Sequence, residues 1–589
     1  MLRRHVIPAH EPSSRPSGPD SPSSPDTPSS LDSRPPPSVL TATADITAAY
    51  AALQDHSLVD VGDLTAWLRA WSDLEAAIDG DGVRRGIATA CAVDDHDALL
   101  AHRDHVERVA PHCDALRRRL ARRLLDHPAS AALDPARHEN LLRIFAAERA
   151  RPDVSAELAQ DEQRLLAEVL RLRAAATATW DGAPRDLAVV ESVLDDPDRA
   201  RRESAWRAVA DRHTVDRPAR DALFDRLLAV RRDHAAAAGF ADVRAHRFAL
   251  LARDFTPDDC HELHAAIVAE VVPLADELLA RRRRALGLAT LRPWDLSAPQ
   301  HPADRTHSST DEPALIAGLT RALADVDRDL ADQFASLAAH DLLDLLARPG
   351  KAPGAFQADL APGQPFVFAS AVGRREDLWT VLHEVGHALH ALACADEPLV
   401  WNRRPPRAFA ELAATAVELL AGAHLGAFYA PAAARAARRE QLVQAVLFLA
   451  HAACVDAFEH WLYTDRAGAT WPAARDLVWH DLHARHFPGV DWSGLETERA
   501  GQWQRQGHLF SAPFTLLDYA LAQLGALQLL ERHAASPAST LAELRRALAL
   551  GGRAGPRELY AAAGLDLAFT RDHVARRMQH VRRALADLE

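Results

Sequence analysis

The 589-residue chain has almost no lysine and few cysteines. Its 68 basic residues include one lysine, Lys351, so arginine occupies nearly every basic position. Around that lysine, residues 350–354 read Gly-Lys-Ala-Pro-Gly, where either a compact ammonium or a tight glycine turn is required. The five cysteines are scattered and form no Cys-x-x-Cys pair. This pattern predicts reduced thiols in a cytoplasmic protein and no disulfide framework.

The chain also lacks an excess of positive charge and any long apolar run. Its formal net charge is −14 at pH 7, which argues against nucleic acid or an anionic membrane as the main partner. No apolar run approaches the roughly 18 residues that a membrane-spanning helix needs. Arg3 and Arg4 have no apolar segment behind them, so we expect no secretory signal there. These features predict a protein without a membrane partner or a nucleic-acid partner.

Strand signals are scarce, and helical periodicity dominates. Residues 11–38 contain 19 Ser or Pro among 28 positions, too few apolar groups to offset the entropy of ordering, so residues 1–42 are predicted to form a disordered tail. From about Ala44 the apolar spacing becomes helical, as in residues 222–239, where Gly239 ends the run. With 48% hydrophobic residues the chain can bury cores in more than one lobe. We therefore predict a mainly α fold.

Residues 383–387 read His-Glu-Val-Gly-His, within a stretch whose apolar residues have helical spacing after an expected N-cap at Asp377. Two histidines four residues apart lie on one face of an α-helix, so both imidazoles can reach one metal ion. Glu384 follows the first histidine and can project toward an attacking water molecule. The spacing is typical of zinc hydrolases, with His383 and His387 as ligands and Glu384 as general base.

A third ligand decides between a zinc site and a chance match. The chain holds 30 histidines, and residues 260–264, Cys-His-Glu-Leu-His, have a similar composition but the wrong spacing. Residues 405–418 read as a second helix, with prolines at the start and Gly422 near the end. Its Glu411 completes a two-His, one-Glu set that leaves the fourth zinc position open; the alternative is an ordinary surface carboxylate. Glu418, two turns further, suits a hydrogen bond that orients a ligand histidine.

These segments resemble the thimet oligopeptidase and oligoendopeptidase F family of zinc metallopeptidases, in its bacterial branch. The resemblance rests on residues 383–390 and on Phe409-Ala410-Glu411. Three further segments agree with it: residues 292–296 (Arg-Pro-Trp-Asp-Leu), 348–356 and 508–523. It extends from about Ala188 to the C-terminus, and more loosely back to about Ile46. We therefore expect an N-terminal helical region at 43–185 and a catalytic region at 186–589.

The resemblance implies an architecture and an activity. The family has two mainly helical lobes flanking a deep, narrow channel, with a small β-sheet near the zinc helix. The implied function is that of a zinc-dependent endopeptidase, an oligopeptidase whose partners are short unfolded peptides. One zinc per chain is expected, held by His383, His387 and Glu411. Glu384 would take a proton from the attacking water and pass it to the leaving amine.

Residues 507–523 resemble the family segment that places a histidine and several tyrosines over the scissile bond. Matched by position, His508 and Tyr519 are retained and are predicted to be catalytic. Relatives have one or two further tyrosines where this chain has Thr515 and Leu516. Because losing one oxyanion donor typically costs on the order of 10²–10³ in turnover, Tyr519 is expected to carry more of the task here.

Residues 365–372 form the best strand signal, just ahead of the zinc helix. In relatives the matching strand borders the active-site groove, where an exposed edge can pair with an extended peptide. On that basis Phe368, Ala369 and Ser370 are predicted to bind substrate. A short structural hairpin explains the same pattern equally well.

Two other functions are compatible with these residues. One is a zinc-bearing peptide-binding protein with reduced or lost turnover, motivated by Thr515 and Leu516. The other is a hydrolase dedicated to one precursor peptide or to a different amide. The intact zinc ligands and Glu384 favour a working peptidase. The sequence does not specify the cleavage-site preference, the physiological substrate or the oligomeric state.

Overall fold

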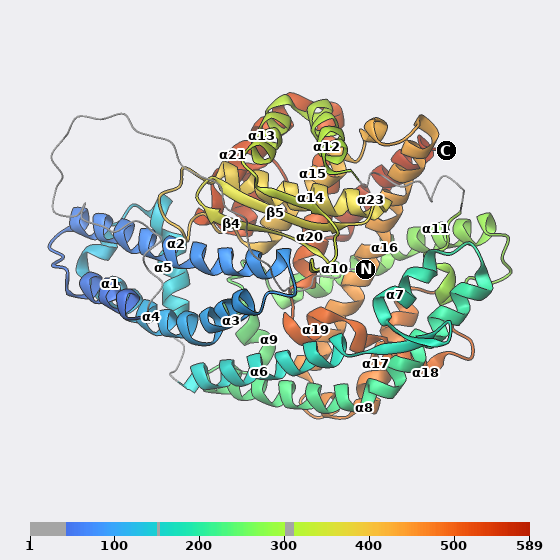
Figure 1. Ribbon diagram of the computed structural model, residues 1–589, viewed down its shortest axis with the longest axis horizontal. Coiled ribbons are helices and arrows are strands. Elements are labelled where there is room, and N and C mark those ends of the chain that lie inside the picture. The colour runs from blue at the N-terminus through green and yellow to red at the C-terminus, as the bar shows by residue number, and fades with distance from the viewer. Residues whose placement is uncertain (1–42, 150–153, 301–310) are drawn as a thin grey trace. The chain divides into compact units, whose positions relative to one another are not determined.

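The computed structural model describes residues 43–149, 154–300 and 311–589 (Figure 1). The predicted tail, residues 1–42, lies outside the described residues. Within these ranges the fold is mainly α with two small sheets, as the sequence predicted. The chain forms two compact units that are not contiguous in sequence. Of the described residues, unit 1 contains 43–149, 311–405 and 548–553, and unit 2 contains 154–300, 406–547 and 554–589.

Unit 1 combines the first helices of the chain with a three-stranded sheet and the helix of the His-Glu-x-x-His motif. Trp71 stacks on Phe145 with ring centroids 5.0 Å apart, and Trp401 packs edge-on against both rings. The elements of unit 1 are α1 (Thr43–Asp55), α2 (Val61–Cys91), α3 (His96–Asp104), α4 (Ala110–Asp126), α5 (Pro135–Arg149), α12 (Glu312–Val326), α13 (Arg328–Ala339), β3 (Leu343–Leu346), β4 (Ala355–Ala361), β5 (Gln364–Ala371) and α14 (Arg375–Ala393).

Unit 2 is almost entirely helical. The run predicted at residues 222–239 lies in its longest helix, and Gly239 follows that helix with a φ of 78°. The elements of unit 2 are α6 (Val154–Ala174), β1 (Thr177–Trp180), β2 (Ala183–Asp186), α7 (Leu187–Ser192), α8 (Arg199–Ala237), α9 (Val243–Leu250), α10 (Pro257–Glu270), α11 (Val272–Ala285), α15 (Arg407–Ala421), α16 (Pro431–Thr464), α17 (Pro472–His486), α18 (Glu496–Ala500), α19 (Gly507–Ser511), α20 (Leu516–Ala535), α21 (Pro537–Leu548), α22 (Pro556–Ala562) and α23 (Arg571–Ala586).

Among the described residues, α16 is the one helix whose length and composition would allow it to cross a membrane. The sequence analysis predicted that no such apolar run exists, so this helix was not expected. In the structure 72% of its most apolar 18-residue window is buried inside the protein. α16 packs against α10, α17 and α20. Its apolar surface therefore serves the core of unit 2.

The sheet of unit 1 has the strand order β3-β5-β4. β4 and β5 form an antiparallel hairpin with Phe356 opposite Phe368, and β3 runs parallel along the other side of β5. The amide of Ser370 donates to the carbonyl of Gly354 at 2.9 Å. β5 is therefore the central strand, and the prediction that Phe368, Ala369 and Ser370 offer an exposed edge to a peptide is wrong. β4 and β5 do form a hairpin, as the alternative expected, and substrate binding by these three residues stays a prediction.

Lys351 ties this sheet together from inside. Its ammonium donates to the carbonyls of Asp344, Leu346 and Ala369 at 3.1, 2.8 and 2.6 Å. It also donates to the Asp344 carboxylate at 2.6 Å, and its side chain has no exposed surface. The glycines on either side, at 350 and 354, both have positive φ. The compact ammonium and the glycine turns are thus both used in this segment.

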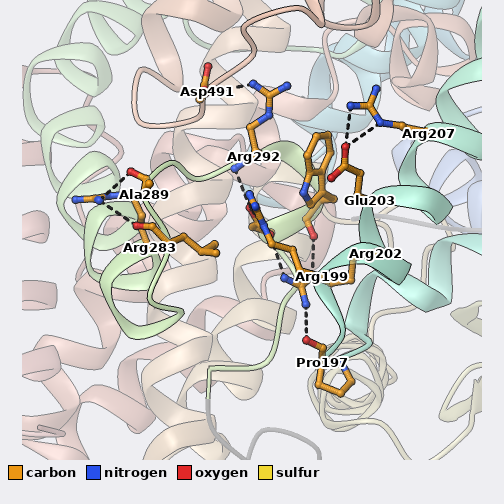
Figure 2. A network of polar contacts seen from close by, with 12 residues as sticks. Pro197, Arg199, Arg202, Glu203, Arg207, Arg283, Ala289, Arg292 and Asp491 are labelled. Atoms are coloured by element: carbon orange, nitrogen blue, oxygen red, sulfur yellow. Dashed lines mark hydrogen bonds and ion pairs between the residues drawn. The ribbon is translucent and has the colours of Figure 1, made fainter.

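Residues 292–296, part of the family resemblance, brace the start of α8 in unit 2. Asp295 is fully buried and accepts hydrogen bonds from Arg199 at 2.8 Å and from Arg202 at 3.0 Å. Arg202 also donates to the carbonyl of Trp294 at 3.0 Å, and Arg292 pairs with Asp491 at 3.2 Å (Figure 2). A buried carboxylate with two arginine partners is costly to disrupt. The segment is therefore structural.

Lys351→Met is expected to lower the free energy of unfolding by about 3–5 kcal/mol, because buried carbonyls and a carboxylate lose their shared donor. Arg348→Met is the matched control. Arg348 pairs with the same Asp344 carboxylate at 2.6 Å but is 47% exposed, so its loss is expected to cost about 1 kcal/mol or less. Denaturant-induced unfolding of both variants measures the difference. Equal unfolding midpoints would show that the buried ammonium adds nothing.

Candidate active site

α14 carries the His-Glu-x-x-His motif on a helix with one buried face. Asp377 accepts hydrogen bonds from the amides of Val372 and Arg374 at 2.7 and 2.8 Å. Arg374 is the N-cap position, so the prediction of Asp377 as N-cap is wrong, although its carboxylate does satisfy backbone donors at this helix end. The predicted apolar stripe is buried along its whole length: Leu378, Val381, Leu382, Val385 and Leu389.

His383 and His387 project from the side of α14 opposite that stripe, and both are half-buried. Their ring centroids are 4.9 Å apart with the planes at 86°. Each ring offers a ligand nitrogen within 4.8 Å of the other. Glu384 lies between them in sequence and is buried. The spacing of four thus brings two imidazoles into the range that a shared metal ion requires.

A third histidine, His390, lies one turn beyond His387 and is buried. Burial, and then the proximity of His387, lowers the pKa of His390 to about 3. The ring is therefore neutral at physiological pH and adds no positive charge behind the histidine pair.

α15 spans Arg407–Ala421, with Pro406 at its N-cap and Gly422 at its C-cap, close to the predicted bounds. Glu411 lies in its second turn and is 3% exposed. Arg407, one turn earlier, lies 3.9 Å from the Glu411 carboxylate. The helix packs along α20. Glu411 therefore has a fixed position within unit 2 and is not an ordinary surface carboxylate.

Glu418, two turns along α15, is linked to α16. The side-chain amide of Gln441 donates to the Glu418 carbonyl at 3.0 Å and to its carboxylate at 3.3 Å. Arg438 donates to the side-chain oxygen of Gln441 at 2.6 Å. These bonds fix the orientation of Glu418 within unit 2.

His508 on α19 and Tyr519 on α20 lie together in unit 2, with ring centroids 5.8 Å apart. The Tyr519 hydroxyl oxygen accepts a hydrogen bond from Arg407 at 3.4 Å. Arg407 therefore lies between Tyr519 and Glu411. The sequence reasoning missed this arginine, and its i,i+4 spacing from Glu411 was the signal that pointed to it.

Thr515 contacts the ring of His508 and fixes its orientation. Its hydroxyl donates to the carbonyl of Ala512 at 2.6 Å, which uses its one proton. The 3.2 Å contact between Thr515 Oγ1 and His508 Nδ1 then requires Nδ1 to be the donor. The neutral ring consequently has its lone pair on Nε2. A neutral His508 can accept a hydrogen bond or a proton at Nε2, but it cannot donate one there.

Two buried arginines hold this segment of unit 2 in place. Arg231 of α8 donates to the carbonyls of Leu509, at 3.0 Å, and Phe510. Arg253 donates to the carbonyl of Phe514. Phe514 has a φ of 64°, a strained conformation for a bulky residue that persists only where its surroundings enforce it. The positions of His508 and Thr515 are therefore set by arginine contacts from distant parts of the sequence.

Comparison with known families decides the identity. Residues 192–579, more than half of the chain, match the sequence profile of peptidase family M3. The chain belongs to peptidase family M3. The matched range contains all of the predicted ligand and catalytic residues, in both units: His383, Glu384, His387, Glu411, His508 and Tyr519. The resemblance stated from the motifs is confirmed.

Two curated proteins that this chain resembles are named as oligoendopeptidase F or its homolog. Over 182 residues the chain is 24% identical to an oligoendopeptidase F homolog of Lactococcus lactis subsp. lactis (strain IL1403). This aligned stretch covers 30% of this chain and 30% of that homolog. Over the same number of residues the chain is 22% identical to the chromosomal oligoendopeptidase F of Lactococcus lactis subsp. cremoris. The aligned stretch again covers 30% of each chain. The matched part thus spans less than a third of the length of these relatives.

Solved structures share the M3 fold. "PZ peptidase A with inhibitor 2" aligns with a TM-score of 0.84 at 23% identity, covering 92% of this chain and 96% of that chain. Oligoendopeptidase-F from Enterococcus faecium aligns with a TM-score of 0.63 at 14% identity, covering 93% of this chain and 97% of that one. The predicted mainly α fold is confirmed by these likenesses.

Proposed function

We propose that this M3 chain is a zinc-dependent endopeptidase that hydrolyses short, unfolded peptides. The observation that carries the proposal is the pair His383 and His387 on one side of α14, with Glu384 between them and the opposite face buried. Membership of family M3 supports it. The restriction to short peptides, by a channel between two lobes, is proposed from the family resemblance, and a cytoplasmic location from the cysteine pattern.

The donor set fits a catalytic zinc ion. Two imidazole nitrogens on adjacent turns and one carboxylate, from Glu411, make a three-ligand set that leaves one position open. Glu411 lies early in α15, just after the chain passes from unit 1 to unit 2 at Pro406. When bound, zinc polarises a peptide carbonyl and lowers the pKa of water from 15.7 to about 7. Glu418 is proposed to orient one of the ligand histidines through a hydrogen bond.

The remaining residues handle protons and charge. Glu384 accepts the proton of the attacking water and delivers it to the leaving amine. Tyr519 donates its hydroxyl hydrogen to the oxyanion as charge develops on the substrate. In its contact with Arg407 the Tyr519 oxygen is the acceptor, so that contact does not use the hydroxyl hydrogen. His508, with its lone pair on Nε2, accepts a hydrogen bond from a substrate N–H and becomes a donor there only after taking up a proton.

A peptide-binding protein with lost turnover is the second candidate, and the oxyanion donors motivate it. The Thr515 hydroxyl is committed to Ala512 and His508. Leu516 is apolar and 1% exposed, so neither replacement supplies a donor. A hydrolase dedicated to one precursor peptide remains a further alternative. Cleavage of a quenched fluorescent peptide library, with and without a chelator, separates a general peptidase from both.

Glu411→Gln is expected to release about one equivalent of zinc per chain, because a neutral amide is a poor zinc ligand. Glu384→Gln serves as the control and is expected to retain its zinc, since Glu384 is not a ligand. Elemental analysis of the purified variants measures the difference, with circular dichroism as a check on folding. Full zinc content in Glu411→Gln would remove Glu411 from the ligand set.

Glu384→Gln is expected to lower turnover by about 10²–10⁴ while peptide affinity is unchanged, because the amide cannot accept the proton of the attacking water. Steady-state kinetics on a fluorogenic peptide and equilibrium binding of the same peptide test the two parts. A variant that keeps more than a tenth of the parent rate contradicts the general-base role.

Tyr519→Phe is expected to lower kcat by about 10² with little change in KM, the pattern of an interaction made mainly in the transition state. Tyr560→Phe is the matched control. Tyr560 is a buried tyrosine of unit 2 whose hydroxyl donates to the carbonyl of Ala408 at 3.3 Å, so its loss is expected to leave kcat unchanged. Parent-like kinetics in Tyr519→Phe would assign the oxyanion to other groups.

A further inference from the structure

Residues 260–264 have the wrong spacing for a His-Glu-x-x-His motif, yet they contribute to a second cluster of ligand side chains inside unit 2. Cys260 and His264 lie four residues apart on α10, and Asp456 and His460 lie four residues apart on α16. α10 packs against α16. We propose that these four side chains form a second metal site, which takes one structural zinc ion. The chain then holds two zinc ions, and not the single ion that the sequence predicted.

The ligand atoms already lie close together. One atom each from Cys260, Asp456 and His460 lies within 4.8 Å of the others. Nε2 of His264 is 2.7 Å from Oδ2 of Asp456, and Nε2 of His460 is 3.4 Å from the same oxygen. Tetrahedral zinc bonds of about 2.0–2.3 Å place ligand atoms roughly 3.3–3.8 Å apart. Shifts of about 1 Å bring Cys260, Asp456 and His460 to these separations. His264 lies outside that group of three, and it becomes the fourth ligand by exchanging its hydrogen bond to Asp456 for a bond to the ion.

The donor chemistry selects zinc among the common divalent cations. One sulfur, two imidazole nitrogens and one carboxylate oxygen form a mixed set that suits zinc, whereas magnesium and calcium prefer oxygen ligands throughout. Four protein ligands close the coordination shell and leave no position for water, which distinguishes a structural site from a catalytic one.

Buried atoms without partners give an independent indication of a missing ion. Cys260 and Asp456 have no exposed surface, and His460 is 4% exposed. Oδ1 of Asp456 and Nε2 of His460 make no hydrogen bond. A buried polar atom left unsatisfied costs about 1–3 kcal/mol, and native proteins rarely accumulate two in one cluster. A cation between these side chains satisfies both atoms at once.

The protonation states are compatible with loading of an ion. Burial opposes ionisation of Asp456, but the hydrogen bond from His264 and the proximity of the His460 ring outweigh it and hold the pKa of Asp456 below the usual range. Burial raises the pKa of the Cys260 thiol, which faces the carbonyl of Thr256 at 3.3 Å. On binding, zinc replaces the thiol proton, which passes to solvent. The thiolate and the carboxylate together balance the two charges of the ion.

One contact must change when the ion binds. Nη1 of Arg244 lies 3.3 Å from Nδ1 of His460. Coordination through Nε2 places the ring hydrogen on Nδ1, so that nitrogen can no longer accept from the guanidinium. Arg244 is half-buried, and its side chain can move toward solvent.

An ion at this position would support the segment that carries His508. The ring of His460 packs edge-on against Phe514, with centroids 5.3 Å apart and planes at 89°. Phe514 is the strained residue next to Thr515. Fixing His460 on a metal therefore fixes one wall of the pocket that enforces this conformation.

The test compares zinc content in the parent protein, Cys260→Ala and Cys454→Ala. Cys454 is the matched control, a fully buried cysteine of α16 outside the cluster. Cys260→Ala is expected to lose about one equivalent of zinc, and Cys454→Ala none. The proposed catalytic ligands contain no sulfur, so thiolate-to-cobalt charge-transfer absorption in the cobalt-substituted protein reports this site alone. That band is expected in the parent and in Cys454→Ala, and not in Cys260→Ala.

Two further variants make the result unambiguous. Asp456→Asn is a nearly isosteric change and is expected to lose the same equivalent of zinc. This variant tests the site even if Cys260→Ala does not fold. His383→Ala combined with His387→Ala is expected to keep one equivalent and the cobalt band. The proposal is overturned if the parent binds a single equivalent that this double variant loses entirely, with no cobalt–thiolate band. Full retention of two equivalents by the double variant would instead refute the catalytic zinc site.

Discussion

The candidate active site depends on one helix whose two faces meet different surroundings. α14 buries its apolar stripe, and burial of each such side chain is worth roughly 1.5–3 kcal/mol before entropy is counted. Rotating the helix by one residue, about 100°, would turn part of that stripe toward the less buried side that His383 and His387 now occupy. The stripe therefore fixes the direction of His383 and His387 far more strongly than either histidine does. The helix in turn packs on β4 and β5, the strand pair next to the Lys351 ammonium.

Features that repeat with a helical period could be predicted from the sequence. The mainly α fold follows from helical spacing of apolar residues along the chain. The bounds of α15 and the proximity of His383 to His387 follow from residue spacing within a single helix. The position of β5 in its sheet could not be predicted. A short apolar run has the same appearance in an edge strand and in a central strand, and only the partners distinguish them.

Contacts between distant segments were the main gap in the sequence reasoning. The cluster around Asp456 combines two pairs with i,i+4 spacing, one on α10 and one on α16. His264 and Asp456, which are in contact, are 192 residues apart in the sequence. Each pair alone is an ordinary feature of a helix, and only the packing of α10 on α16 shows that they face each other. Thr515 is a similar case. As a missing tyrosine it suggested only lost catalysis, whereas its bonds to Ala512 and His508 give it a role of its own in fixing a tautomer.

The distribution of lysine and arginine follows from the shape of the acceptors. Arg231 serves carbonyls on successive residues of α19, a spread-out target that suits a planar fork with five N–H donors. At Lys351 three carbonyl oxygens and one carboxylate oxygen surround a single nitrogen. An ammonium suits this arrangement because its three protons point outward from one atom. A guanidinium there would bring a larger, flat group into a pocket with no exposed surface and would leave N–H groups without acceptors. A chain that otherwise uses arginine therefore has its one lysine at a position where the acceptors converge on a single nitrogen.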